Sequence, residues 1–158
     1  VDWCRYVVDR DPTSLVSSSH GATAGRFDGD YHAFSIEFAA ENPQDSALAQ
    51  ISCGNYMAAS WPEAISFRPP AALQVACENG IAFVDLPSTV VWFDGAGRHM
   101  ESLDSERPVG ETLLLSFHRQ VTSLVRNPGG LQDAYRATSI VAAARTSILE
   151  GRRVPLQF

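Results

Sequence analysis

Consecutive β-strand patterns constrain the fold of this chain more than any other feature. Residues 30–39 read DYHAFSIEFA, in which three apolar side chains alternate with polar ones. Alternation with a period of two is typical of a strand with one buried face. The preceding stretch 15–25 is rich in small and β-prone residues, and FDGD at 27–30 is a turn signal, so we predict a hairpin.

Further strands follow at short intervals. Residues 47–57 form a third strand pattern, and the stretch 73–86 reads LQVACENGIAFVDL. Asn79-Gly80 lies between two apolar runs there and favours a type I′ hairpin. A second hairpin, in the stretch 89–102, is predicted to turn at 94–97. The sequence therefore predicts six to eight strands, mostly consecutive and so mostly antiparallel.

Helical patterns stand at the two ends of the chain. Residues 111–127 carry an apolar stripe at helical spacing and stop at Asn127-Pro128-Gly129-Gly130, a strong breaker. A closing helix is predicted from Leu131 to Gly151, where glycine suits the C′ position. Its expected inner face is made of Ala134, Ala137, Val141, Ala144 and Ile148.

A short opening helix is predicted from Asp2, its candidate N-cap, to a point near Asp11, with Trp3, Tyr6 and Val7 on one face. Together these patterns predict an α+β fold: a single domain over residues 1–158 with an open antiparallel sheet and helices packed on one face.

The strand segment 90–93 reads VVWF and is apolar on both alternating faces. A sheet with one solvated face would place polar residues at every second position. The stretch 15–25 is also small-residued on both faces. We therefore expect part of the sheet to be covered twice, by helices on one side and by another subunit, or alternatively a local loop, on the other.

Composition narrows the range of partners. The net charge of −6 argues against non-specific nucleic-acid binding, and no apolar run is long enough to cross a membrane. Cys4, Cys53 and Cys77 are odd in number and lack CxxC spacing. They predict buried thiols in a reducing compartment, and hence a cytoplasmic protein.

No motif in the sequence predicts a catalytic, cofactor-binding or metal-binding set. The stretch 21–27, GATAGRF, lacks the Lys-Ser/Thr of a phosphate loop, and the four histidines lack metal-ligand spacing. Asp28 and Asp30 fit a turn better than a calcium loop. Two classes of function stay open: the substrate-binding and oligomerising half of an enzyme, and a stand-alone binding or scaffold module.

The closing stretch NPGGLQDAYRATSIVAAARTSILEGRRVPL resembles the C-terminal end of the Gfo/Idh/MocA family of NAD(P)-dependent oxidoreductases. CENGIAFVDL resembles the strand-turn-strand hairpin of that family, and VDWCRYVV resembles the helix that follows its Gly-x-His-x-x-Asp pattern. The matching positions of the closing pattern are Ser147, Gly151, Arg152, Val154 and Leu156.

The resemblance implies a C-terminal domain that walls a substrate pocket and pairs subunits through its sheet face. It implies that NAD or NADP is bound by an N-terminal Rossmann domain, which would precede Val1 together with the catalytic Lys and His. The 158-residue chain would then be inactive alone. The implied substrate is a sugar, a polyol or a related small polar molecule.

Candidate substrate-binding residues lie in the stretch NYMAASWPEAISFR, which follows a predicted strand. Loops on a rigid sheet often carry binding groups. Tyr56 and Trp61 offer aromatic faces for a sugar ring, and Arg68 offers a charged donor. Core or interface packing for the aromatic residues, and a solvated side chain for Arg68, are the alternatives.

Overall fold

The computed structural model is α+β and describes residues 1–21, 31–54, 73–85, 88–103, 108–123 and 129–158. The chain divides into two compact units, which are considered separately here: residues 1–58 with 127–158, and residues 59–126. The described strands form two antiparallel sheets of four strands each. The sequence predicted strands of the right number and direction, but as one continuous sheet. The single domain over 1–158 stays a prediction.

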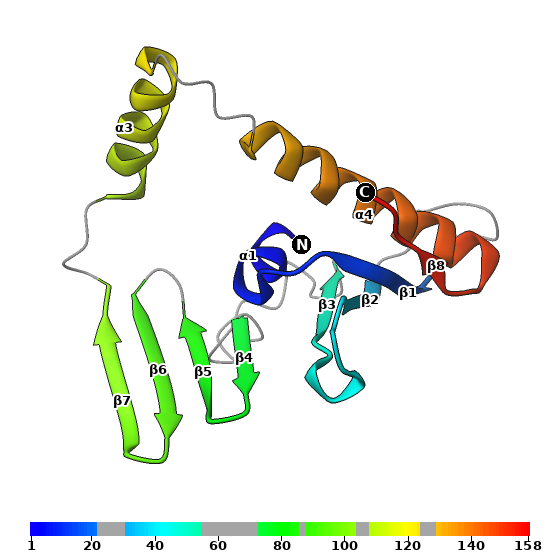
Figure 1. The fold of residues 1–158 in the computed structure, drawn as a ribbon, viewed down its shortest axis with the longest axis horizontal. Helices are drawn as coiled ribbons and strands as arrows, with labels where there is room; N and C mark the ends of the chain where they lie inside the picture. Colours follow the sequence, from blue (N-terminus) through cyan, green and yellow to red (C-terminus); the bar gives the residue numbers. More distant parts are fainter. Residues whose placement is uncertain (22–30, 55–72, 86–87, 104–107, 124–128) are drawn as a thin grey trace, which may run out of the picture. The chain divides into compact units, whose positions relative to one another are not determined.

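The first unit contains a four-stranded sheet in the order β3-β2-β1-β8, with two helices (Figure 1). Its elements are α1 (Asp2–Val8), β1 (Pro12–His20), β2 (Tyr31–Phe38), the 3₁₀ helix η1 (Pro43–Asp45), β3 (Leu48–Gly54), α4 (Gly129–Glu150) and β8 (Val154–Pro155). β1 and β2 pair antiparallel from His20↔Tyr31 onward, which confirms the predicted pairing. The turn predicted at 27–30 lies outside the described residues.

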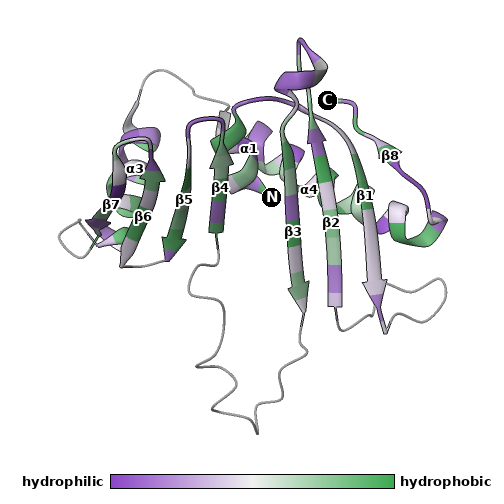
Figure 2. Cartoon of the chain, turned by 90° about the horizontal axis from the view of Figure 1, so that it is seen from below, coloured by the Kyte–Doolittle hydropathy of each residue, from purple (hydrophilic) through white to green (hydrophobic). Residues whose placement is uncertain are grey.

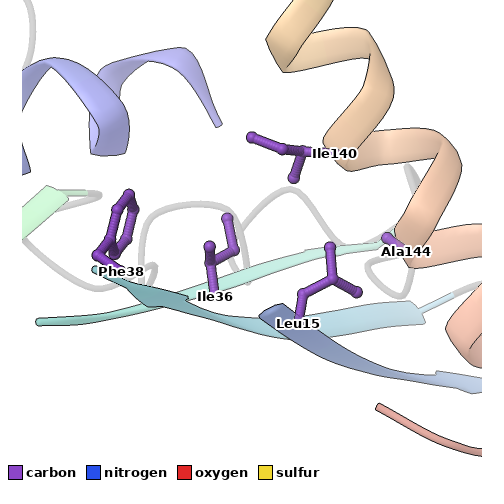
Figure 3. Close-up of a cluster of buried hydrophobic side chains, with 5 residues drawn as sticks. All are labelled: Leu15, Ile36, Phe38, Ile140 and Ala144. Carbon is purple, nitrogen blue, oxygen red and sulfur yellow. The ribbon is translucent and has the colours of Figure 1, made fainter. Parts of the chain in front are cut away.

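The core of the first unit lies between one face of this sheet and the two helices (Figure 3). Leu15, Ile36 and Phe38 point from the strands toward Ile140 and Ala144 of α4. Partly buried residues of α1, namely Cys4 and Val8, pack against the same cluster. Because α1 and α4 share this face, no described helix of this unit covers the other face of the sheet.

The buried faces of both helices differ in part from those that the apolar spacing predicted, although Ala144 of the predicted inner face of α4 is buried as expected. Tyr6 of α1 is 83% exposed, whereas Cys4 and Val8 pack inward. On α4, Ile140 is fully buried and Val141 is 44% exposed. The helix ends as expected, because Gly151 takes the left-handed conformation with φ 63°. Asp2 is not the N-cap of α1; it is the first helical residue and pairs with Arg5.

The second unit contains the sheet β4-β5-β6-β7 and helix α3. Its elements are β4 (Leu73–Cys77), β5 (Gly80–Asp85), β6 (Thr89–Asp94), β7 (Gly97–Ser102) and α3 (Val109–Thr122). The hairpin between β6 and β7 turns at 94–97 as predicted. The part of the predicted helix at 124–127 lies outside the described residues.

The β4–β5 hairpin is present, but its turn differs from the predicted one. Cys77 pairs with Gly80, so the loop residues are Glu78 and Asn79. A type I′ turn needs a positive φ at both loop residues. Among the described non-glycine residues only Asp9 has a positive φ, so Glu78 and Asn79 do not form a type I′ turn. Gly80 belongs to β5, where an added Cβ would collide with the backbone oxygen of Phe93. The glycine therefore serves strand packing and not the turn.

Candidate functional site

The three residues that the sequence offers for substrate binding, Tyr56, Trp61 and Arg68, lie in the stretch 55–72, outside the described residues. Their role stays a prediction. A candidate site within the described part of the chain must therefore be built from the surface of the two units.

The outer face of the β3-β2-β1 sheet carries small and polar side chains and a hollow. Side chains alternate along each strand, so the neighbours of the core residues Leu15 and Ile36 point outward. On this sheet α1 and α4 cover one face, and the other face carries small, hydroxyl and amide side chains; whether a loop or another subunit covers it stays a prediction. The outward residues of the central rows are Val16, Ser18, Ala33, Ser35, Gln50 and Ser52.

The hollow on this face has a volume of about 510 Å³, and we call it the Ala33 hollow. Ala33 lies on the central strand with Ser18 opposite it on β1 and Ser52 opposite it on β3. Two larger outward residues, Tyr31 and Gln50, also line it. A methyl group surrounded by longer side chains leaves a depression, and the register of three strands determines where it forms.

A smaller hollow of about 230 Å³ adjoins the first and shares Val16 and Ser35 with it. It contains an ion pair between Glu37 of β2 and Arg153, which precedes β8. The Ser14 hydroxyl donates to Glu37 Oε2 at 2.7 Å. This hydrogen bond and the guanidinium of Arg153 hold the pKa of the Glu37 carboxyl below its ordinary value of 4.5.

The lowered pKa of Glu37 gives the first unit a pH-dependent contribution to stability. A depressed carboxyl pKa stabilises the fold above pH 4.5, and this contribution disappears as the pH falls through the folded-state pKa. We expect Glu37→Gln to lower the melting temperature at pH 7 and to have a smaller effect at pH 3. Thermal unfolding at both pH values measures this difference.

Glu41→Gln, a change at an exposed glutamate beyond β2, is the matched control for this measurement. An equal loss of melting temperature at pH 7 and pH 3 in Glu37→Gln would show that the ionised carboxylate is not what stabilises the contact between β2 and Arg153.

Ser19, His32 and Cys53 lie in register across β1, β2 and β3 on the other face of this sheet. Ser19 Oγ and His32 Nδ1 are 2.9 Å apart and hydrogen bonded. All three cysteines are free thiols, and Cys53 and Cys77 are exposed. The expectation of buried cysteines is wrong for these two because both lie near the end of a strand, where the sheet provides little cover. Within the described ranges, His, Cys, Asp and Glu form no group of three that could hold a metal ion.

A polar and aromatic group marks the β6–β7 hairpin of the second unit. The rings of Trp92 and His99 stack with centroids 5.0 Å apart, and His99 Nε2 lies 3.0 Å from Asp94 Oδ1. The same Asp94 oxygen accepts the Ala96 N–H across the turn at 2.8 Å. The hydrogen bond with His99, followed by that with Ala96, lowers the pKa of Asp94. The group holds the hairpin turn together.

The second unit also carries the apolar strand that the sequence singled out. Val90 and Trp92 lie on one face of β6, and Val91 and Phe93 lie on the other. No described residue of β4, β5, β6 or β7 is buried, although apolar residues lie along both faces of β5 and β6 (Figure 2). Helix α3 is exposed along its whole length, including Leu113 and Phe117. This unit therefore presents apolar surfaces that its described residues do not cover.

Sequence reasoning missed the Ala33 hollow. The alternation in 30–39 indicates which residues point outward, but a hollow requires a small residue flanked by larger ones on two neighbouring strands. The pairing of β1, β2 and β3 supplies that information.

Comparison with known proteins gives no relative from which to transfer a site: no family model and no curated protein matches the chain. In the described part of the chain, no helix is long and apolar enough to span a membrane.

Proposed function

We propose that this chain is the substrate-binding and oligomerisation domain of an NAD(P)-dependent oxidoreductase of the Gfo/Idh/MocA kind, acting in the cytoplasm on a sugar, a polyol or a related small polar molecule. The α+β architecture supports the proposal. So does the closing segment, in which Ser147, Gly151 and Val154 form the helix end and the strand that the resemblance implies.

The observation that carries the proposal is the uncovered apolar sheet of the second unit. Phe93 on one face of β6 is 41% exposed, and no side chain of β4–β7 is buried on either face. Apolar area that the described residues of this unit leave uncovered favours association. The occupant that we propose is a second copy of this chain, because an isologous pair buries the same apolar residues twice.

The sequence has no GxGxxG motif, the glycine-rich turn whose backbone approaches the pyrophosphate of a dinucleotide closely, and this supports the proposal. NAD(P) is therefore proposed to bind to a Rossmann domain of the parent protein, with the catalytic Lys and His. The proposed contribution of this chain is the substrate pocket and the subunit contact.

Sedimentation equilibrium tests the proposal on the 158-residue chain. We expect a dimer or larger assembly, which one of two charge insertions on opposite faces of β6 dissociates: Val90→Lys or Val91→Lys. The two positions are adjacent, half-buried and chemically identical, so each variant is the control for the other. The variant that dissociates the assembly identifies the face that is buried.

Two results would contradict the proposal. Tight binding of NAD or NADP to the chain, measured by fluorescence titration, would show that it is not the cofactor-free half of an oxidoreductase. A strict monomer at all concentrations would favour the stand-alone binding or scaffold module.

A further inference from the structure

We propose that Asn79 is a site of self-modification, at which the chain converts its own asparagine into isoaspartate and aspartate through a cyclic imide with the backbone of Gly80. Asn79-Gly80 is the one Asn-Gly pair in the sequence, and Asn79 lies in the two-residue loop of the β4–β5 hairpin. This inference goes beyond the proposed function and is independent of it, because the reaction needs no cofactor, no substrate and no second copy of the chain.

The reaction requires only these two residues and water. The backbone nitrogen of Gly80 loses its proton and forms a bond to the side-chain carbon Cγ of Asn79, while the bond from Cγ to the amide nitrogen breaks and ammonia leaves. Water then opens the five-membered imide at one of its two carbonyl carbons. One opening gives aspartate, and the other gives isoaspartate, in which the main chain runs through the side chain. No atom is oxidised or reduced.

The hairpin loop exposes the reacting groups to water. Glu78 and Asn79 are exposed, and so is Cys77 before them. Water therefore has access both to take up the proton and to open the imide. Glycine has no Cβ, so no side chain of Gly80 shields its nitrogen from the amide of Asn79.

The end of the hairpin must open for the attack, because Gly80 pairs with Cys77 across the loop. This pair is the last of the β4–β5 ladder, and the ends of paired segments open most readily. β4 is also the outermost strand of its sheet, and Gln74 and Ala76 within it are exposed. We therefore expect the reaction to be slower in the folded chain than in the unfolded chain, and still measurable.

Conversion changes both the charge and the length of the loop. Either product adds one negative charge to a chain whose net charge is already −6. The new carboxylate lies at the same end of the sheet as Glu78 and Asp94, since Gly80 pairs with Asp94 across β5 and β6. Isoaspartate also adds one carbon atom to the main chain, and a two-residue loop has no spare length to accommodate it. Chains that carry isoaspartate should therefore lose the pair between Cys77 and Gly80.

Asn42 is an internal control in the same chain. It is exposed, as Asn79 is, but it precedes Pro43, whose backbone nitrogen carries no hydrogen and cannot form the imide. The amide nitrogen of Asn42 also donates to Asp45 Oδ2 at 3.0 Å. If exposure alone controlled the reaction, the two asparagines would react alike, whereas the proposed mechanism favours Asn79.

Incubation of the folded 158-residue chain at neutral and at mildly alkaline pH, followed by peptide mapping with mass spectrometry, tests the proposal. We expect the mass gain of one deamidation in the peptide that contains Asn79, and a faster gain at the higher pH because the nitrogen of Gly80 must lose its proton. Asn79→Gln should abolish the gain, since glutamine closes a larger ring more slowly. Asn79→Asp supplies the aspartate product as a reference, so that isoaspartate is recognised by its different elution.

Two results would overturn the proposal. The first is an Asn79 that stays intact in the folded chain; its conversion in urea would then show that the hairpin blocks the attack. The second is equal conversion of Asn42 and Asn79, which would show that direct hydrolysis of the amide, and not the imide, is responsible. Neither result bears on the sedimentation of the β6 charge insertions, so failure of this site and failure of the proposed function are distinguishable.

Discussion

Replacing Ile140 by alanine is expected to lower the free energy of unfolding of the first unit by about 2–5 kcal/mol. Ile140 is fully buried and fills the space between α4 and the strand residues Leu15 and Ile36. Truncation removes buried methyl groups and leaves a cavity that the paired strands cannot easily close. Urea unfolding followed by far-UV circular dichroism measures the change.

Val141→Ala is the matched control for Ile140→Ala, because Val141 is the next residue of α4 and is 44% exposed. Its effect should stay within about 0.5 kcal/mol. Together, Ile140→Ala and Val141→Ala also test which face of α4 is buried against the sheet. A larger loss from Val141→Ala than from Ile140→Ala would support the inner face that the apolar spacing predicts and would contradict the structure.

Ser147→Ala is expected to destabilise the first unit by about 1–3 kcal/mol, through lost hydrogen bonds with groups that are left partly buried. The side chain of Ser147 is fully buried, accepts the Ser17 N–H at 2.9 Å and donates to the Arg152 carbonyl at 2.7 Å. The hydroxyl thus joins β1, the end of α4 and the segment that leads into β8. Thermal unfolding of the variant measures the loss.

Thr146→Ala removes the neighbouring hydroxyl, which donates only to the Ala142 carbonyl within α4. We expect this variant to unfold close to the parent chain. Equal destabilisation by Thr146→Ala and Ser147→Ala would indicate that the hydroxyl of Ser147 does not join the helix end to β1.

Several strands and one hairpin turn of this chain follow from local sequence. The alternation in β2 and the turn at the β6–β7 hairpin depend on residues that are close in the chain, and the structure pairs both as predicted. The end of α4 at Gly151 is also local, because only a glycine takes the left-handed conformation there without strain.

Which face of each helix is buried could not be predicted from local sequence in the same way. The apolar residues Tyr6 and Val141 have the spacing of a core stripe, yet they are exposed. On α4 the small residues Ala144 and Ser147 let the helix approach β1 closely. Which stripe is buried depends on the shape of the sheet beneath the helix, and spacing within the helix does not report that shape.

The amino-acid sequence by itself determined the antiparallel pairing of consecutive strands, the absence of a dinucleotide motif and the apolar character of both faces of β6. Tertiary structure alone decided that the strands divide between two sheets, that Ser147 bonds to β1 and that a hollow lies over Ala33. The physical reason is the distance along the chain between the residues that interact. Propensity, alternation and turn chemistry act over a few residues. Register across three strands joins residues tens of positions apart, such as Ser18 and Ser52, and the packing of α4 on β1 joins residues more than a hundred positions apart, such as Ser17 and Ser147.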